Sequence, residues 1–144
     1  MKNRKIASVI LVAGMMLSAM PFAVSARAFS PRVANVGEIT VKDGDGNVIG
    51  TGTYERVEDG DDAGAYASCT NHSDYYTHAA CRLQALKNDG TVLDSDSGSN
   101  KITAYCFVNV SSSCRTIVGK WAIYIPVNGL VPPTDPQVEK TYNP

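Results

Sequence analysis

The 144-residue chain carries 13 basic and 14 acidic side chains, which gives a formal net charge of −1. A chain of this length suits one domain rather than two. Without a surplus of basic residues, the composition argues against nucleic acid and anionic lipid headgroups as partners.

The N-terminus has the form of a secretory signal. Three basic residues in the first five positions precede the apolar run IASVILVAGMMLSAM, and PFAVSARA follows with small residues before a cleavage point after Ala26 or Ala28. We therefore expect residues 1–26 to be a signal peptide and the protein to be secreted by a bacterium into the extracellular space. The alternative is an uncleaved membrane anchor, because residues 6–24 are nearly long enough to span a bilayer.

Removal of this leader changes the charge of the chain. It takes three basic residues and no acidic one, so the formal net charge of the remainder is 10 − 14 = −4. No later segment is apolar enough to cross a membrane, and no cysteine follows the leader to accept a lipid. We expect no stable membrane insertion after cleavage.

From Val36 onward the sequence predicts strands rather than helices. Apolar residues alternate or form short runs bounded by Gly, Asn, Asp and Ser, and no stretch sustains a helical period. Ile39 and Val41 share one face of NVGEITVK, and HAACRLQALK alternates with Cys81 and Leu83 facing inward. The segment GAYASC alternates in the same way.

Strands at this spacing, joined by turns, predict an all-β fold, a small antiparallel β-sandwich of about seven strands over residues 36–127. KITAYCFVNV and CRTIVGKWAIYIPV are expected to form the most hydrophobic hairpin, which contains the only tryptophan, Trp121. Residues 128–144 contain four prolines. Proline cannot continue a central strand, so we expect a surface-lying or loose tail.

Residues 43–50, DGDGNVIG, suit either a calcium loop or a hairpin turn. Asp43, Asp45 and Asn47 occupy the first, third and fifth places of an EF-hand-like loop. The sixth and twelfth places, which require Gly and Glu, hold Val48 and Tyr54. Repeated Asp-Gly between two strand-like runs favours the hairpin.

A second acidic segment, ERVEDGDDAG, offers a weak calcium site at Asp59, Asp61 and Asp62. Extracellular calcium binds clustered carboxylate oxygens of this kind. Most such clusters are solvated loops, and we expect no metal or other cofactor here.

Four cysteines follow the leader, and an even number in an exported chain predicts two disulfides. We favour Cys69 with Cys81, because a hairpin centred near Tyr75 would set them opposite each other, and Cys106 with Cys114, which flank FVNVSSS in the same manner. Each bridge would close a loop of roughly ten residues and contribute about 2–3 kcal/mol. A competing arrangement joins Cys81 to Cys106 across the core, since a bulge shifts strand parity. A zinc site is disfavoured because tight C-x-x-C pairs are missing.

Candidate catalytic residues are scarce. The two histidines, His72 and His78, lie in one segment, but no serine occupies a G-x-S-x-G setting. Disulfides would remove free thiols, and nothing selects two of the 14 acidic residues as a glycosidase pair. We therefore expect a protein that is not an enzyme, with His78 as a hydrogen-bonding residue at a strand edge.

Two tyrosines, Tyr75 and Tyr76, fall in the predicted loop that also holds both histidines. A loop tyrosine supplies contact area at low entropic cost, and its hydroxyl supplies a hydrogen bond, so it can stack on a sugar or hold a protein partner. We expect Tyr75, Tyr76, His72 and His78 to form the binding site. The aromatic residues on strands are expected to pack in the core or on a sheet face.

The order AYASC, NHSDYYTHAACRL, NDG, DSDSG, TAYCFV and CRTIVGKW, over about residues 64–121, resembles the small exported bacteriocins of the lactococcin group that inhibit septum formation. The resemblance implies a β-sandwich that binds the cell-wall precursor lipid II, with residues 72–78 near the active end. The four cysteines, the N-terminal hairpin and the proline-rich tail are departures from that group.

These observations together predict a secreted, non-enzymatic bacterial protein that binds a partner at or outside the cell surface, such as a cell-wall component. The alternatives are a bacteriocin-like protein acting on the envelope and a carbohydrate-binding module. The sequence does not specify the oligomeric state.

Overall fold

The computed structural model describes residues 32–59 and 62–144, and within them the chain forms eight β-strands and no helix. The strands are β1 (Arg32–Lys42), β2 (Val48–Asp59), β3 (Asp62–Asn71), β4 (His78–Leu86), β5 (Val92–Asn100), β6 (Thr103–Asn109), β7 (Thr116–Tyr124) and β8 (Gln137–Tyr142). The predicted signal peptide, residues 1–26, lies outside the described residues.

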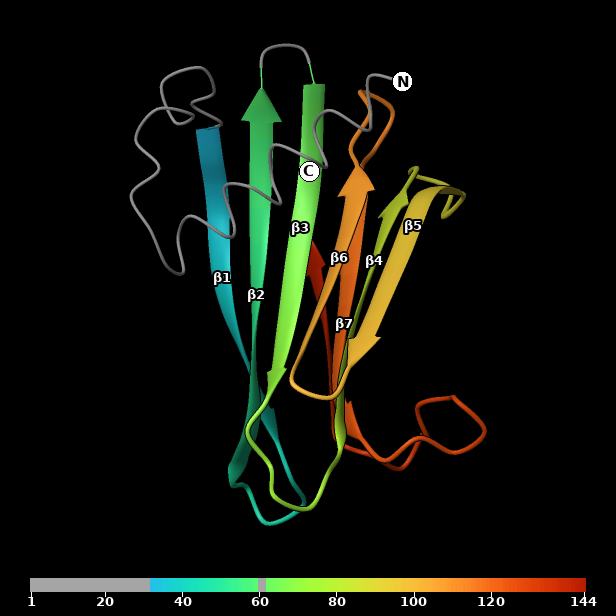
Figure 1. The fold of residues 1–144 in the computed structure, drawn as a ribbon. Helices are drawn as coiled ribbons and strands as arrows, with labels where there is room; N and C mark the ends of the chain where they lie inside the picture. Colours follow the sequence, from blue (N-terminus) through green and yellow to red (C-terminus); the bar gives the residue numbers. More distant parts are fainter. Residues whose placement is uncertain (1–31, 60–61) are drawn as a thin grey trace.

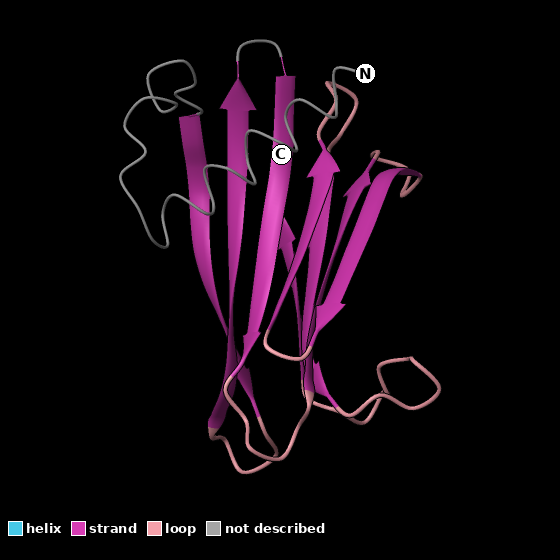
Figure 2. Cartoon of the chain, in the orientation of Figure 1, coloured by secondary structure: helices cyan, strands magenta, loops and turns pink. Residues whose placement is uncertain are grey.

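The strands form two antiparallel four-stranded sheets that pack face to face (Figures 1 and 2). Sheet A has the order β1-β2-β3-β6, and sheet B has the order β5-β4-β7-β8. The all-β, two-layer prediction is confirmed. The inward faces also follow the predicted alternation, since Ile39, Val41, Cys69, Cys81 and Leu83 are all buried in the shared core.

Trp121 on β7 is the largest fully buried side chain of this core. Its Nε1 donates a hydrogen bond to the carbonyl oxygen of Ser68 on the opposite sheet, 3.0 Å away. A Cβ atom at Gly52 would lie 2.5 Å from the indole ring and 2.8 Å from the same carbonyl oxygen. Sheet A can approach the indole because this position is glycine.

Three connections pass from one sheet to the other, as in Greek-key sandwiches: β3 to β4, β5 to β6 and β6 to β7. Two predicted hairpins are therefore wrong. The strand ending near Cys69 and the one starting near Cys81 lie in different sheets, and so do the two strands of the predicted Trp121 hairpin. A short polar connection can lead to the opposite sheet as readily as to a neighbouring strand.

The C-terminal segment contributes a strand that the sequence did not predict. Residues 137–142 form β8, which pairs with β7 at the edge of sheet B, with Trp121 opposite Val138. The last internal proline, Pro136, precedes the strand. Because Pro136 lies before the first residue of this edge strand, its missing N–H removes no hydrogen bond from the β7–β8 ladder. The prolines of the segment are therefore compatible with a strand at residues 137–142.

All four cysteines, Cys69, Cys81, Cys106 and Cys114, are buried free thiols in the structure, so the two expected disulfides are not present. In the part of the chain that the structure describes, no helix has the length and hydropathy needed to cross a bilayer.

Candidate functional site

One end of the sandwich carries four connecting segments, residues 43–47, 72–77, 101–102 and 125–136, at the lower side of Figure 1. We refer to this surface as the loop end. It contains the predicted binding residues, because the β3–β4 connection crosses it from sheet A to sheet B.

Residues 72–77 are held by hydrogen bonds from two polar side chains. The Asn71 Oδ1 atom accepts a bond from the backbone N–H of Ser73 at 2.9 Å. The Ser73 Oγ atom accepts bonds from the backbone N–H groups of Tyr75 and Tyr76, at 3.0 and 2.9 Å. These are Asx- and ST-turn contacts, which fix a loop without a regular ladder.

The same loop is tied to its neighbours by further bonds. The Asn71 backbone N–H donates to the Ile102 carbonyl at 2.8 Å, and the His72 N–H donates to the Ile49 carbonyl at 2.9 Å. On the other side, the Thr77 N–H donates to the Tyr124 carbonyl at 3.2 Å. Strand ends from both sheets therefore position the loop.

Tyr75 projects from this fixed loop with 72% of its surface exposed, whereas Tyr76 packs partly against the core. The two rings meet edge to face with centroids 5.0 Å apart. Ile102, which is 70% exposed, and Val48, which is 53% exposed, lie on the segments bonded to the loop. The loop end thus presents the Tyr75 ring and several aliphatic side chains to solvent, among them Leu130 of the 125–136 segment, which is 71% exposed.

Two acidic groups, Asp43 and Asp135, lie near the hydroxyl of Tyr76. Burial, followed by the nearby charge of Asp135 and the neighbouring Tyr75 and Asp43, raises the pKa of the Tyr76 hydroxyl above its usual range. Tyr76 therefore remains a neutral hydrogen-bonding group at physiological pH.

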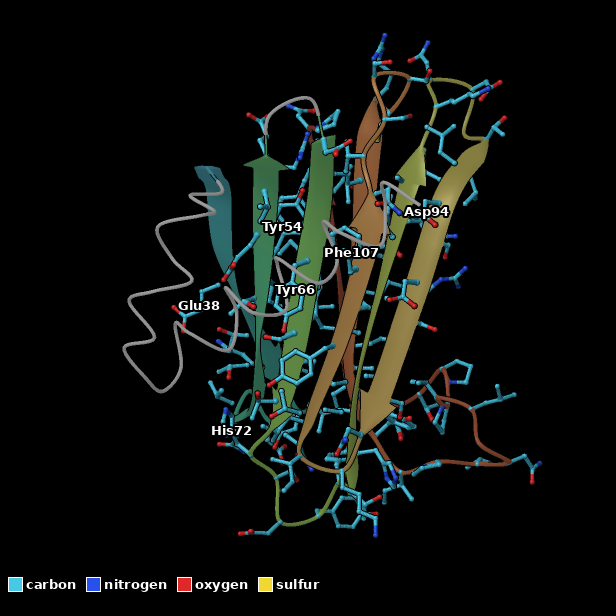
Figure 3. All side chains as sticks on the ribbon, turned by 45° about the horizontal axis from the view of Figure 1, so that its top comes forward. Glu38, Tyr54, Tyr66, His72, Asp94 and Phe107 are labelled. Carbon is cyan, nitrogen blue, oxygen red and sulfur yellow. The ribbon has the colours of Figure 1, made fainter. Side chains whose placement is uncertain are left out.

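The two histidines do not meet. His72 Nε2 lies 2.8 Å from Thr51 Oγ1 on sheet A (Figure 3 labels His72 at the loop end). His78 begins β4 in sheet B, where its Nδ1 lies 2.8 Å from Thr77 Oγ1 and its ring lies 5.7 Å from that of Tyr124. His72 thus lies in the β3–β4 connection against sheet A and His78 on β4 of sheet B, and the two rings bond to different hydroxyls.

The DGDGN segment forms the β1–β2 hairpin turn that the sequence favoured. The Asp43 carboxylate accepts bonds from the Asp45 and Asn47 backbone N–H groups, at 3.0 and 2.8 Å, and from Asn47 Nδ2 at 3.0 Å. The bonds from Asn47 hold the pKa of Asp43 below its ordinary value of 3.8. Both carboxylate oxygens thus serve the turn.

The second acidic segment is only partly described, since the side chains of Asp59 and Asp61 lie outside the described residues and Asp62 is half-buried. Among the described residues, no group of three or more His, Cys, Asp or Glu side chains could hold a metal ion.

The sequence did not single out an aromatic surface on the outer face of sheet A. Tyr66 on β3 lies opposite Phe107 on β6, and its ring stacks against that of Tyr105 with centroids 5.9 Å apart (Figure 3). Tyr105 is 53% exposed and Phe107 is half-buried, whereas Tyr66 is buried. Side chains alternate between the two faces of a strand, so with Cys69 and Cys106 facing inward these three rings must face outward. This alternation could have predicted the surface from the sequence.

Hydroxyl groups border this aromatic surface. Thr53 and Ser68 are hydrogen-bonded through their hydroxyls at 2.8 Å, and Thr70 and Thr103 at 3.1 Å. Beside Tyr66, burial raises the pKa of the Glu55 carboxyl.

A pocket of about 410 Å³ lies on the outer face of sheet B, between the sheet and part of the 125–136 segment. Its lining includes Arg82, Lys120, Tyr124 and Leu130. Arg82 and Lys120 are register partners on neighbouring strands, and Lys120 pairs with Glu139 at 2.8 Å. Sequence analysis missed this pocket because it requires four strands and a loop to be placed together.

No family model, no curated protein and no solved structure matches this chain. Its function must therefore be argued from its own surfaces.

Proposed function

We propose that this is a secreted, non-enzymatic bacterial protein that binds a partner at or outside the cell surface through the loop end. The observation that carries the proposal is Tyr75, an aromatic side chain 72% exposed on a loop fixed by Asn71 and Ser73. An exposed ring on a fixed backbone loses little conformational entropy when it is buried by a partner.

A cell-wall component is the partner class that fits both the export signal and these surfaces. The fixed tyrosine and the exposed Ile102 offer stacking and apolar contact, and the Tyr76 hydroxyl offers a hydrogen bond. The pocket on sheet B adds Arg82 and Lys120, which suit the carboxylates that wall peptides carry.

A second candidate is a carbohydrate-binding module that uses the outer face of sheet A. Tyr105 and Phe107, which pack on the buried Tyr66, form an aromatic surface bordered by hydroxyl groups, and sugars stack on such rings. This candidate shares the ligand class of the first but places it on a different surface.

The resemblance to lactococcin-type bacteriocins supports a third candidate, an antibacterial protein directed at the envelope through residues 72–78. Inhibition of bacterial growth by the purified protein distinguishes it from a binding protein without toxicity. No zone of inhibition on a broad panel would remove this candidate.

Pull-down on purified peptidoglycan separates the two binding surfaces. We expect Tyr75→Ala to reduce the retained fraction at least tenfold, and Tyr105→Ala, with a similarly exposed ring, to leave it unchanged. Equal retention of Tyr75→Ala and wild type would refute binding through the loop end. A loss confined to Tyr105→Ala would transfer the function to sheet A.

We further propose that export exposes the cysteines to an oxidising compartment.

A further inference from the structure

Three of the four thiols meet between the two sheets. Cys69 on β3, Cys81 on β4 and Cys106 on β6 are all at most 3% exposed. The Cys81 Sγ atom lies 3.6 Å from the carbonyl oxygen of Ala67, and Ala67 is the register partner of Cys106. The Cys81 side chain therefore reaches sheet A at the level of the Ala67–Cys106 pair.

The two sheets approach each other unusually closely at this level. β4 and β6 belong to different sheets, yet their Cα atoms come within 8 Å, whereas packed sheets are usually about 10 Å apart. Gly98, the register partner of Cys81, lies so near β6 that a Cβ atom there would collide with the carbonyl oxygen of Tyr105, the neighbour of Cys106. A disulfide needs this proximity, because its Cα atoms are usually about 4.4–6.8 Å apart.

The other thiols have different surroundings. The Cys69 Sγ atom lies 3.7 Å from the carbonyl oxygen of Ala122, so this thiol contacts β7 of the opposite sheet. Cys114 lies in the β6–β7 connection, with its Sγ 3.4 Å from the carbonyl oxygen of Thr116. Thr116 pairs with Leu86, five residues along β4 from Cys81 and so about 16 Å away. Cys114 is thus remote from the cluster.

We propose that Cys81 and Cys106 form an inter-sheet disulfide in an oxidising compartment, while Cys69 and Cys114 remain thiols. This resolves the pairing in favour of the arrangement across the core and against the two local bridges. The inference does not depend on the proposed partner.

The reaction is a thiol–disulfide exchange with a disulfide oxidant, either a small molecule or a protein. One thiolate attacks the oxidant and forms a mixed disulfide, and the second cysteine then displaces the oxidant's remaining thiol. Cys81 and Cys106 lose two electrons and two protons in total. The oxidant's disulfide gains both and becomes two thiols.

The protonation of the buried thiols bears on when the bond forms rather than on which cysteines pair. Burial, followed by the neighbouring Cys81, raises the pKa of the Cys69 thiol to about 12, so its thiolate is scarce at neutral pH. The interaction with Cys81, more than burial, raises the pKa of the Cys106 thiol. Oxidation therefore occurs during folding, before the sheets close, and the folded core then protects the bond from exchange with Cys69.

Peptide mapping tests the pairing on the wild-type protein. The protein is refolded from urea in a buffer of reduced and oxidised glutathione, alkylated after denaturation without reduction, and digested with trypsin. Trypsin leaves Cys69 with Cys81 in one peptide, residues 57–82, and Cys106 with Cys114 in another, residues 102–115. We expect these two peptides to be linked, with two alkylated cysteines.

Chymotrypsin then identifies the pair, because cleavage after Tyr75 or Tyr76 separates Cys69 from Cys81, and cleavage after Phe107 separates Cys106 from Cys114. We expect the Cys81 and Cys106 peptides to be joined. Four alkylated cysteines, unlinked tryptic peptides with internal bridges, or a link through Cys69 or Cys114 would each overturn the proposal.

Variants supply an independent measurement. A reductant should lower the melting temperature of wild type and of the matched control Cys69→Ala by several degrees. It should leave the Cys81→Ala/Cys106→Ala double variant unchanged. If a reductant lowers the melting temperature of the double variant as much as that of wild type, the proposal is contradicted. If the double variant does not fold, the peptide map of the wild-type protein decides.

Discussion

On one side of the sandwich the edge strand β5 of sheet B faces the edge strand β6 of sheet A, and on the other side β8 faces β1 and β2. We refer to these two contacts between the sheets as seams. The seam between β5 and β6 is polar. Asp96 Oδ2 accepts a hydrogen bond from the Phe107 backbone N–H at 2.9 Å. Asp94 Oδ2 accepts bonds from the backbone and side-chain nitrogens of Asn109, both at 2.8 Å.

The seam between β8 and strands β1 and β2 is aromatic. Tyr54 of β2 and Tyr142 of β8 stack with centroids 3.7 Å apart and planes within 6° (Figure 3 labels Tyr54). The Tyr142 ring also meets Trp121 edge to face at 6.4 Å. Residues from two sheets therefore close this side by burying ring surface.

The two seams are two ways in which edge strands of facing sheets can be held together without a continuous ladder of backbone hydrogen bonds. An edge strand exposes backbone N–H groups that invite another chain to pair. At the polar seam, carboxylates from the opposite sheet occupy such groups on β6. At the aromatic seam, ring contacts between Tyr142 and the side chains of Tyr54 and Trp121 bring the sheets together instead.

The largest effect is expected when a side chain is forced into the polar seam. In Gly98→Ala, the new Cβ would collide with the backbone carbonyl of Tyr105, which cannot rotate away as a side chain could. We expect the free energy of unfolding in urea to fall by about 3 kcal/mol. Gly44→Ala is the control, because nothing lies within 4 Å of a Cβ there. Equal losses in both variants would mean that β5 is not held against β6.

A smaller loss is expected when the aromatic seam is opened. Tyr142→Ala removes the ring that stacks on Tyr54 and meets Trp121. Because Tyr142 is only half-buried, we expect a loss of about 2 kcal/mol rather than the larger cost of a core ring. Tyr142→Phe keeps the ring and should match wild type in the same urea titration. A neutral Tyr142→Ala would show that the stack does not close this seam.

The comparison also shows what the sequence could predict. The period-two alternation of Ile39, Val41, Cys81 and Leu83 predicted which face of each strand is buried. That signal is local, and it says nothing of which sheet a strand joins. The β3–β4 connection was taken for a hairpin loop because six polar residues suit either a hairpin or a passage to the opposite sheet.

The candidate site was predictable to the same extent. Tyr75 was predicted as an exposed loop residue, and it is exposed. The placement of the exposed Ile102 at the same end was not predicted, because the bond between the Asn71 N–H and the Ile102 carbonyl requires the end of β3 to meet the β5–β6 connection. The roles of Asp94 and Asp96 were also missed, since alternating Asp and Ser suggests a solvated strand unless a facing edge is known.

The smallest effect at neutral pH is expected from Tyr54→Phe. The Tyr54 hydroxyl is buried and has no hydrogen-bond partner among the described residues, whereas its ring carries the stack. Phenylalanine keeps the ring and removes the unsatisfied group. We expect the free energy of unfolding at pH 7 to be unchanged or raised by about 1 kcal/mol. A loss of similar size would instead reveal a stabilising bond to the hydroxyl.

Alkaline pH isolates the contribution of the Tyr54 hydroxyl, in the aromatic seam, to the free energy of unfolding. Burial raises the pKa of Tyr54 from 10.0 to about 12, so the neutral hydroxyl is favoured in the folded protein. Stability is therefore full below pH 10, the unfolded value, and is lost as the pH rises from 10 toward 12, because the unfolded chain ionises first. Tyr54→Phe should show a shallower loss over that range in urea titrations, whereas Tyr75→Phe, which alters an exposed ring, should follow wild type. Identical slopes for all three proteins would mean that the Tyr54 hydroxyl is hydrated in the folded state.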